Sequence, residues 1–196
     1  VRDATQGLAT YGAAGTWDVT AVTDFNVLVE ALGNFDEDLT GWDTSGVTTM
    51  ISTFDAADTF NKPVPFDTSS VTTMDSMFYS KLCPWDPCGT SQFNQPVAFD
   101  TSNVNFMGSM FFGTSAFNQP VAFDTSSVTN VELMFYLAVA FNQPVDFDTS
   151  SVTSMYDMFD GAAAFSGPLS FSDTGAVTSM SWMVGCTALN QPLNFD

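Results

Sequence analysis

The phrase "FNQP" and its variants "FSGP" and "LNQP" recur along the chain, and this internal repeat restricts the possible folds more than any other feature. Phe93, Phe117, Phe141 and Phe165 each begin a unit of 24 residues, and Leu189 continues the series. Earlier units begin at Tyr11, Phe35 and Phe60 with less regular lengths. Self-similarity at such a period is typical of units that stack on their neighbours. The sequence therefore predicts a solenoid of repeated coils.

The chain is expected to form a single domain over residues 1–196, because no linker or change of composition divides it. Residues 1–34 are expected to form an N-terminal cap and a degenerate first coil. Regular coils should follow over 35–188, and 189–196 should open an incomplete last coil. A hydrophobic content of 45% is sufficient for a continuous core.

Each unit repeats the same apolar pattern. The pair in "VAF" at 121–123 alternates with period two, which predicts a short strand. Val128, Val131 and Met134 have the spacing of a helical turn. All ten methionines fall in two columns, where unbranched side chains can fill an irregular core. We expect one short parallel β-strand and one short helix or 3₁₀ turn in each coil of about 24 residues.

The phrase "FDTS" resembles the catalytic loop of pepsin-like aspartic proteases, but such an enzyme needs two loops and this chain has at least six. The repeated aspartate follows the strand and precedes the predicted helical turn, where a carboxylate can accept hydrogen bonds from free N–H groups. The sequence predicts a helix-capping ladder at Asp67, Asp100, Asp124 and Asp148. No cofactor is expected; calcium between stacked carboxylates is an alternative, although the glycine-rich turns of calcium-binding repeats are absent.

Other polar columns have structural explanations. Asn94, Asn118, Asn142 and Asn190, each followed by glutamine, are expected to form an amide ladder at a corner of the coils. The Thr and Ser residues that follow each aspartate are expected to form a solvated face; ice binding and O-linked sugar remain alternatives for it.

The charge of the chain limits its partners and its chemistry. Three basic residues stand against 22 acidic ones, and the net charge of −19 would repel nucleic acid and anionic membranes. There is no histidine, which removes the usual general base and the commonest metal ligand. No apolar run is long enough for a membrane span. These features favour a protein that is not an enzyme.

The three cysteines give information about the redox state of the compartment in which the protein resides. Cys83 and Cys88 lie in "CPWDPC", where the short, proline-bracketed spacing favours a loop-closing disulfide; two free thiols are the alternative. Such a disulfide would indicate an oxidising compartment. Cys186 stands where other units have small residues, which predicts a buried packing thiol.

The motif F-N-Q-P-V-x-F-D-T-S-S-V-T-x-M-x-x-M-F is similar to the BspA-like surface-protein repeats of Mycoplasma lipoproteins, other bacteria and secreted algal and protist proteins. The opening "LATYGAAGTWDVTAVTDF" resembles the entry segment of the eukaryotic versions. Val131 in a methionine column and the cysteine insertion depart from the motif. The resemblance implies a leucine-rich-repeat-like solenoid, secreted or at the cell surface, with no catalytic residues.

The last unit, "LNQPLNFD", contains a strand without a polar cap, and solenoid ends need caps. Either a longer array or another subunit should cover it. We expect head-to-tail self-association through Leu189, Leu193 and Phe195, which would make the chain a structural subunit of an extracellular fibre or surface layer. The alternative is a cell-surface adhesion module that binds a glycan or matrix protein through a lateral face.

Overall fold

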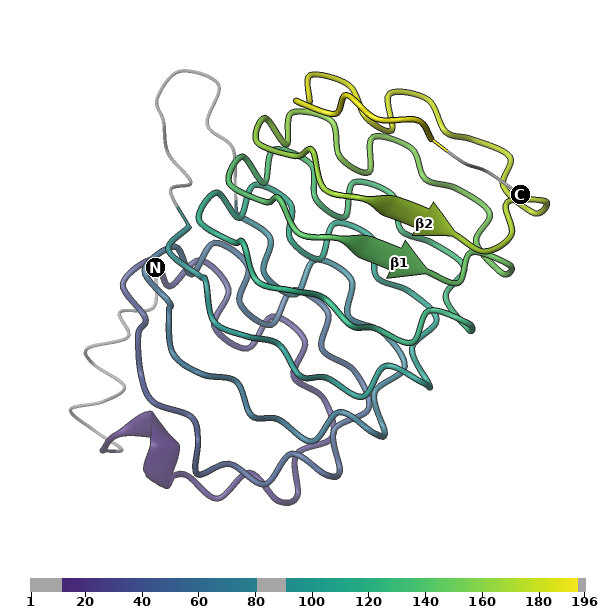
Figure 1. The fold of residues 1–196 in the computed structure, drawn as a ribbon. Coiled ribbons are helices and arrows are strands. Elements are labelled where there is room, and N and C mark those ends of the chain that lie inside the picture. The colour runs from purple at the N-terminus through teal and green to yellow at the C-terminus, as the bar shows by residue number, and fades with distance from the viewer. Residues whose placement is uncertain (1–11, 81–90, 194–196) are drawn as a thin grey trace.

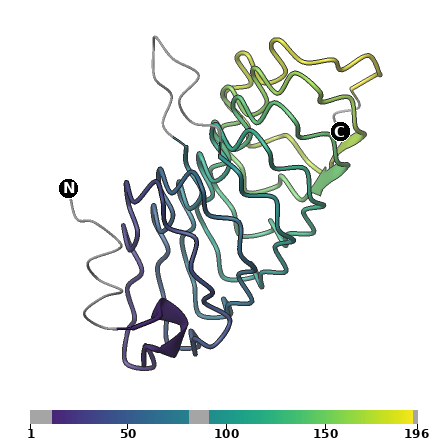
Figure 2. The ribbon, with the colours of Figure 1, turned by 90° about the vertical axis from the view of Figure 1, so that its left-hand side faces the viewer.

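The computed structural model describes residues 12–80 and 91–193. Successive repeats lie side by side in one stack, with the first and last described repeats at opposite ends (Figures 1 and 2). Parallel bridges join one residue of each repeat to the equivalent residue of the next, from Asp24 to Ser179. The chain is therefore a repeat protein in which neighbours in sequence are also neighbours in space.

Regular secondary structure is sparse. The described residues contain one 3₁₀ helix, η1 (Ala14–Thr16), and two strands, β1 (Val145–Phe147) and β2 (Leu169–Phe171). The strands pair in parallel, with Val145 opposite Leu169, and lie side by side in Figure 1. None of the helical structure in this described part has the length and hydrophobicity of a membrane span.

The prediction of a strand in every repeat is only partly right. The expected alternation is present, since Val121 and Phe123 are buried while Ala122 is exposed. Apart from β1 and β2, however, these segments are not regular strands in the described residues. Most of these segments lie between a proline, here Pro120, and an aspartate turn, but so do β1, which follows Pro144, and β2, which follows Pro168.

In the described residues, no regular helix follows the aspartates, and a series of separate three-residue turns takes the place of the predicted helix or 3₁₀ turn. Ser109 and Gly113 have φ angles of 54° and 64°, a left-handed conformation that interrupts a helix. The N–H groups of Ser109 and Phe111 donate instead to the carbonyls of Glu132 and Met134 in the next repeat, at 2.8 and 2.9 Å. The segment has the side-chain spacing of a helix, but its N–H groups alternate between carbonyls of the next repeat and carbonyls three residues back, as in the 3.1 Å bond from the Phe112 N–H to the Ser109 carbonyl.

The eight-residue stretch that begins at the bridge residue of each repeat is called a turn segment. The turn segments are 24–31, 49–56, 73–80, 106–113, 130–137, 154–161 and 179–186. Their fourth, fifth and sixth residues differ in exposure: in 106–113, Ser109 is half-buried while Met110 and Phe111 have no exposed surface. Each turn segment therefore presents some side chains to the core and others to the outside.

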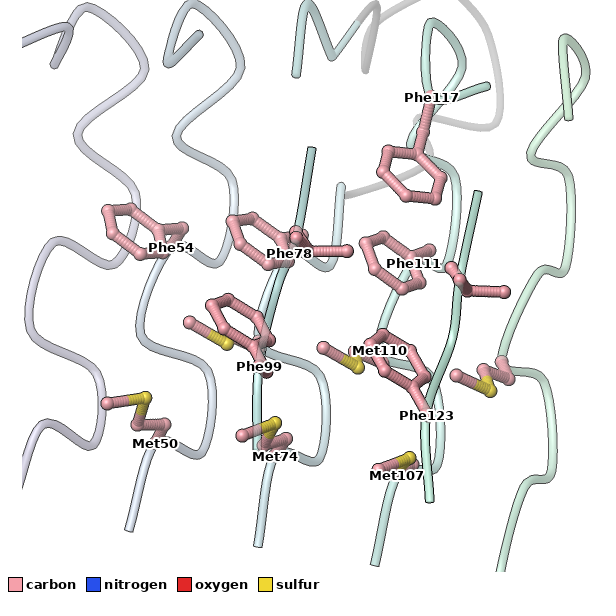
Figure 3. Packing of buried hydrophobic residues seen from close by; sticks show 14 of the residues in the cluster. Met50, Phe54, Met74, Phe78, Phe99, Met107, Met110, Phe111, Phe117 and Phe123 are labelled. Atoms are coloured by element: carbon pink, nitrogen blue, oxygen red, sulfur yellow. The ribbon is translucent and has the colours of Figure 1, made fainter. Parts of the chain in front are cut away.

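The core consists of stacked columns, and the predicted packing role of methionine is confirmed. Met50, Met74 and Met107 lie in a row along the stack with no exposed surface (Figure 3). Val131 takes the methionine position in the next repeat and is almost as deeply buried. Trp42 in the aromatic column also donates its ring N–H to the Ala14 carbonyl at 2.8 Å, which ties η1 to the following repeat.

Cys186 differs from its prediction. It is an exposed free thiol with a φ of 52°, and not a buried packing residue. It lies in the last turn segment, and no further repeat covers it among the described residues. Cys83 and Cys88, for which a disulfide is predicted, lie outside the described residues, as does Phe195.

Candidate functional site

One side of the stack carries the same aspartate in every repeat. The column consists of Asp18, Asp43, Asp67, Asp100, Asp124, Asp148 and Asp173. The Asp124 carboxylate accepts hydrogen bonds from the Ser126 hydroxyl at 2.6 Å and the Ser126 N–H at 3.0 Å, and these bonds lower its pKa. No helix follows, so the predicted helix caps are instead caps of turns.

The next residue of the aspartate turn faces the interior. Thr125 is buried, and its hydroxyl donates to the Asp148 carbonyl of the next repeat at 2.9 Å. Thr68 donates in the same way to the Asp100 carbonyl. The repeated aspartate and threonine thus have their hydrogen bonds within the scaffold, which explains why the aspartate recurs throughout the column and the threonine follows it everywhere except at Asp18, where Val19 stands.

The amide ladder also joins repeats. The Asn118 side-chain oxygen accepts the Asn142 N–H at 2.9 Å and the Gln143 amide at 3.0 Å, and the Asn94 side-chain oxygen accepts the Asn118 N–H in the same way. Ser166 follows Asn142 in this column and has no amide, so the ladder stops before Asn190. These residues hold neighbouring repeats in register.

The outward side chains of the turn segments form a second surface, which we call the turn face. Its residues change from repeat to repeat while the backbone does not. The third positions are Asn26, Ile51, Asp75, Gly108, Glu132, Tyr156 and Ser181, and the seventh positions are Glu30, Asp55, Tyr79, Phe112, Tyr136, Asp160 and Gly185. The fold does not dictate these residues, which makes the turn face the candidate functional site.

An aromatic ladder runs along the turn face. The ring of Phe112 lies 4.5 Å from that of Tyr79 and 4.8 Å from that of Tyr136, in near-parallel stacks. Burial raises the pKa of both tyrosines, and the charges of Asp55 and Asp160 raise them further. Because the rings stack on one another, the outward part of the ladder consists of ring edges and hydroxyl groups.

A hollow of about 230 Å³ lies in the same three repeats as the aromatic ladder. Its lining includes Asp75, Phe106, Gly108, Asn130, Glu132 and Leu133. The Gly108 N–H donates to the Asp75 carboxylate at 2.7 Å, and burial raises the pKa of Asp75 in spite of this bond. The hollow therefore places two carboxylates and an exposed phenyl ring around one small space.

The end predicted for self-assembly forms a third surface, and this one is apolar. Trp182 is 68% exposed, and Met180, Val184 and Leu193 line a hollow of about 370 Å³ beside it. Leu189 and Leu193 are partly buried against the core. In residues 12–80 and 91–193, no three cysteine or acidic side chains are placed to hold a metal ion.

The turn face contains no recurring motif, so the repeated residues of the sequence do not point to it. The sequence signal for the turn face is variation between repeats. When the repeats are aligned on their methionine columns, the third and seventh turn positions differ from repeat to repeat, while the aspartate column does not vary.

Comparison with known proteins gives a family and no activity. The family described as "Mycoplasma protein of unknown function, DUF285" matches residues 3–83, 88–147 and 121–195. No curated protein and no solved structure matches the chain. The match supports the Mycoplasma-type repeat that the sequence motif indicated.

Proposed function

This chain belongs to the DUF285 repeat family, and we propose that it is a non-catalytic recognition module that binds its partner through the turn face. In this proposal the repeats form a leucine-rich-repeat-like solenoid, related to the BspA-like surface repeats and displayed outside the cell. The invariant columns build the scaffold, and the varied turn positions determine what it binds.

The observation that carries the proposal is the contrast between the two surfaces. Seven aspartates recur in one column, while the third turn position has seven different residues. A scaffold requirement acts on every repeat alike, so it cannot account for residues that differ at equivalent backbone positions. Repeat proteins commonly bind along a surface of this kind, built from equivalent positions of successive units.

The composition of the turn face also favours binding. Tyr79, Phe112 and Tyr136 are half-buried and adjacent, and Phe106, in the same turn segment as Phe112, is 47% exposed. Aromatic residues are enriched at the centres of protein interfaces, where they provide large contact areas with little loss of conformational freedom. The hollow in the same repeats gives the surface a concave feature.

The proposal can be tested with residues exchanged between repeats. The turn-face variant carries Phe106→Ser and Glu132→Ser, because serine occupies the equivalent positions at Ser154 and Ser181. The control carries Asn103→Ser and Asn105→Thr outside the turn segments, again with residues found in other repeats. Both should fold. Peptide and glycan arrays are then probed with the labelled wild-type protein and both variants.

We expect ligand signals of the wild type to persist in the control and to disappear in the turn-face variant. Signals that survive the turn-face exchanges, or that disappear only in the control, would contradict the proposal. An array without any wild-type signal above background would count against a recognition role for this surface.

A second candidate function is head-to-tail assembly into an extracellular fibre or surface layer. The exposed Trp182 and the apolar hollow beside it favour a stacked contact with another copy. Trp182→Ser, which introduces the residue found at Ser52 and Ser76, should then lower the assembly state seen by light scattering. An unchanged distribution of particle sizes would remove this candidate.

A further inference from the structure

We propose that the partner of the turn face is a cationic polypeptide segment, one of whose lysine or arginine side chains enters the hollow beside Gly108. This inference rests on the proposed function and specifies the chemistry of its ligand. It is carried by the shape of the hollow, by its aromatic wall and by the distribution of charge on the turn face.

The third turn position is glycine in this repeat, and it lies in the lining of the hollow. A Cβ atom at Gly108 would lie 3.0 Å from the Asn130 side-chain oxygen and 3.3 Å from the Asp75 carboxylate. Both of these neighbouring polar atoms are hydrogen-bond acceptors. A carboxylate can accept about four hydrogen bonds, so the Gly108 N–H leaves Asp75 able to accept more. Donors from lysine or arginine suit this arrangement.

The wall of the hollow also suits a cation. Phe106 is 47% exposed and lines the same space as Asp75 and Glu132. The face of an aromatic ring attracts an ammonium or guanidinium group, and the attraction grows where the cation is partly removed from water. An aliphatic side-chain stem can at the same time contact Leu133 in the lining of the hollow.

The charged residues of the described turn segments are all acidic. No lysine or arginine lies in these segments, and their acidic residues are Asp24, Glu30, Asp55, Asp75, Glu132, Asp157 and Asp160. The described cation Lys62 pairs with Asp36 at 3.0 Å, outside those segments. A cationic partner would therefore meet a complementary potential that speeds its association and selects against acidic partners.

The carboxylates of the turn segments differ from those of the aspartate column in their hydrogen bonds. Asp124 is exposed and already accepts two hydrogen bonds from Ser126. By contrast, Oδ1 of Asp160 is buried and has no hydrogen-bond partner in the described part of the chain. At the hollow itself, the Asp75 carboxylate accepts the Gly108 N–H and retains capacity for a further donor, whereas Oδ1 of Asp124 already accepts two hydrogen bonds and has less such capacity.

A neutral glycan fits the aromatic ladder of this surface less well. Sugar rings bind aromatic side chains mainly through the ring faces, and the faces of Phe112 are covered by Tyr79 and Tyr136 at 4.5 and 4.8 Å. The ladder offers ring edges instead. Edges of Tyr and Phe rings can contact a peptide backbone and its side chains, which favours a polypeptide occupant.

The test compares two pairs of substitutions that change the net charge equally. Asp75→Asn with Glu132→Gln alters the hollow, and Asp100→Asn with Asp124→Asn alters the aspartate column; each pair removes two of the negative charges that give the chain its net −19. The Asp75→Asn change keeps a side-chain oxygen that can accept the Gly108 N–H. Fluorescence anisotropy measures binding of a labelled Gly-Ser peptide that carries several lysines, with a glutamine-substituted peptide as control, at near-physiological salt.

We expect the hollow pair to weaken binding of the lysine peptide by about tenfold or more, and the column pair by less than about threefold, since distant surface charges are largely screened at this salt concentration. The glutamine peptide should bind no variant measurably. Equal weakening by both pairs, or equal binding of the two peptides by the wild type, would overturn the inference.

A second pair of variants tests the hollow without changing any charge. Gly108→Ala partly fills it, whereas Gly46→Ala adds a Cβ atom at an ordinary 3.7 Å from the Thr20 carbonyl. Only Gly108→Ala should weaken binding of the lysine peptide. If the lysine peptide shows no preference while array ligands are still lost from the turn-face variant, the inference about charge is wrong and the proposed function stands. If turn-face changes alter no binding at all, both are wrong.

Discussion

The ring of Phe111 lies 4.1 Å from the ring of Phe117, with 11° between their planes. The same pairing recurs in the next repeat at 4.2 Å between Phe135 and Phe141. Between repeats, Phe111 and Phe135 are 5.6 Å apart. Two aromatic columns therefore form one continuous stack through the core, and each of these rings contacts a ring six residues away along the chain as well as the equivalent ring of a neighbouring repeat.

Phe135→Ala should lower the free energy of unfolding by about 3–5 kcal/mol, because it removes a fully buried ring and leaves a cavity between neighbouring rings. Urea unfolding followed by circular dichroism measures the loss. Phe112→Ala is the control, since Phe112 is only half-buried on the turn face. Equal losses for the two variants would contradict the arrangement of columns described above.

Thr125→Val should cost about 1–3 kcal/mol, because it keeps the shape of the side chain but removes the buried hydroxyl that donates to the Asp148 carbonyl. The matched control is Thr153→Val, whose hydroxyl also donates to a carbonyl of a neighbouring repeat but lies at the exposed surface. Thermal unfolding of both variants gives the comparison. A larger loss for Thr153→Val would show that burial does not determine the effect.

Asp124→Asn should make unfolding less dependent on acid pH. The hydrogen bonds from Ser126 lower the pKa of folded Asp124, so its charged form stabilises the fold above the unfolded pKa. This contribution is lost as the pH falls through the folded pKa. Asparagine keeps the turn but does not titrate.

The stability advantage of the wild type over Asp124→Asn should therefore be constant near neutral pH and shrink below about pH 4. Chemical unfolding over a series of pH values measures this difference. An advantage that grows on acidification would mean that Asp124 is not stabilised in its charged form.

Asn118→Ser should lower the free energy of unfolding by about 1–2 kcal/mol, because Asn142 and Gln143 lose their shared acceptor. The change reproduces Ser166, where the ladder stops. Asn103→Ser is the control, since its side chain makes one exposed hydrogen bond to the Ser69 carbonyl. If the control variant is destabilised as much, the ladder adds nothing beyond an ordinary surface bond.

The buried columns could be predicted from sequence because each apolar residue recurs at a fixed interval, and only a stack of repeats buries such columns together. The backbone geometry of the turn segments could not be predicted from sequence. Val128, Val131 and Met134 have a spacing that fits a helix, yet the left-handed residues Leu133 and Leu137 carry no sequence signal for that conformation. Their φ angles follow from hydrogen bonds between repeats, which a local pattern does not contain.

Among the other positions, some could be predicted from sequence and others could not. The amide ladder was predictable as far as Asn142, since identical side chains on neighbouring repeats can bond in only a few ways. Cys186 was predicted incorrectly, because small residues at its column suggested burial while the side chain is exposed on the last turn segment. Gly108, in the lining of the hollow, stands where the other described turn segments have larger residues, a feature visible only when the repeats are compared position by position.

The most direct test of the central claim is NMR mapping of the lysine-peptide titration on ¹⁵N-labelled protein. We expect shift changes confined to amides of turn segments 73–80, 106–113 and 130–137, which carry the hollow and the aromatic ladder. Amides beside Asp67, Asp100 and Asp124 should not move. Changes centred on that aspartate column, with the three turn segments unaffected, would contradict the turn face as the binding surface.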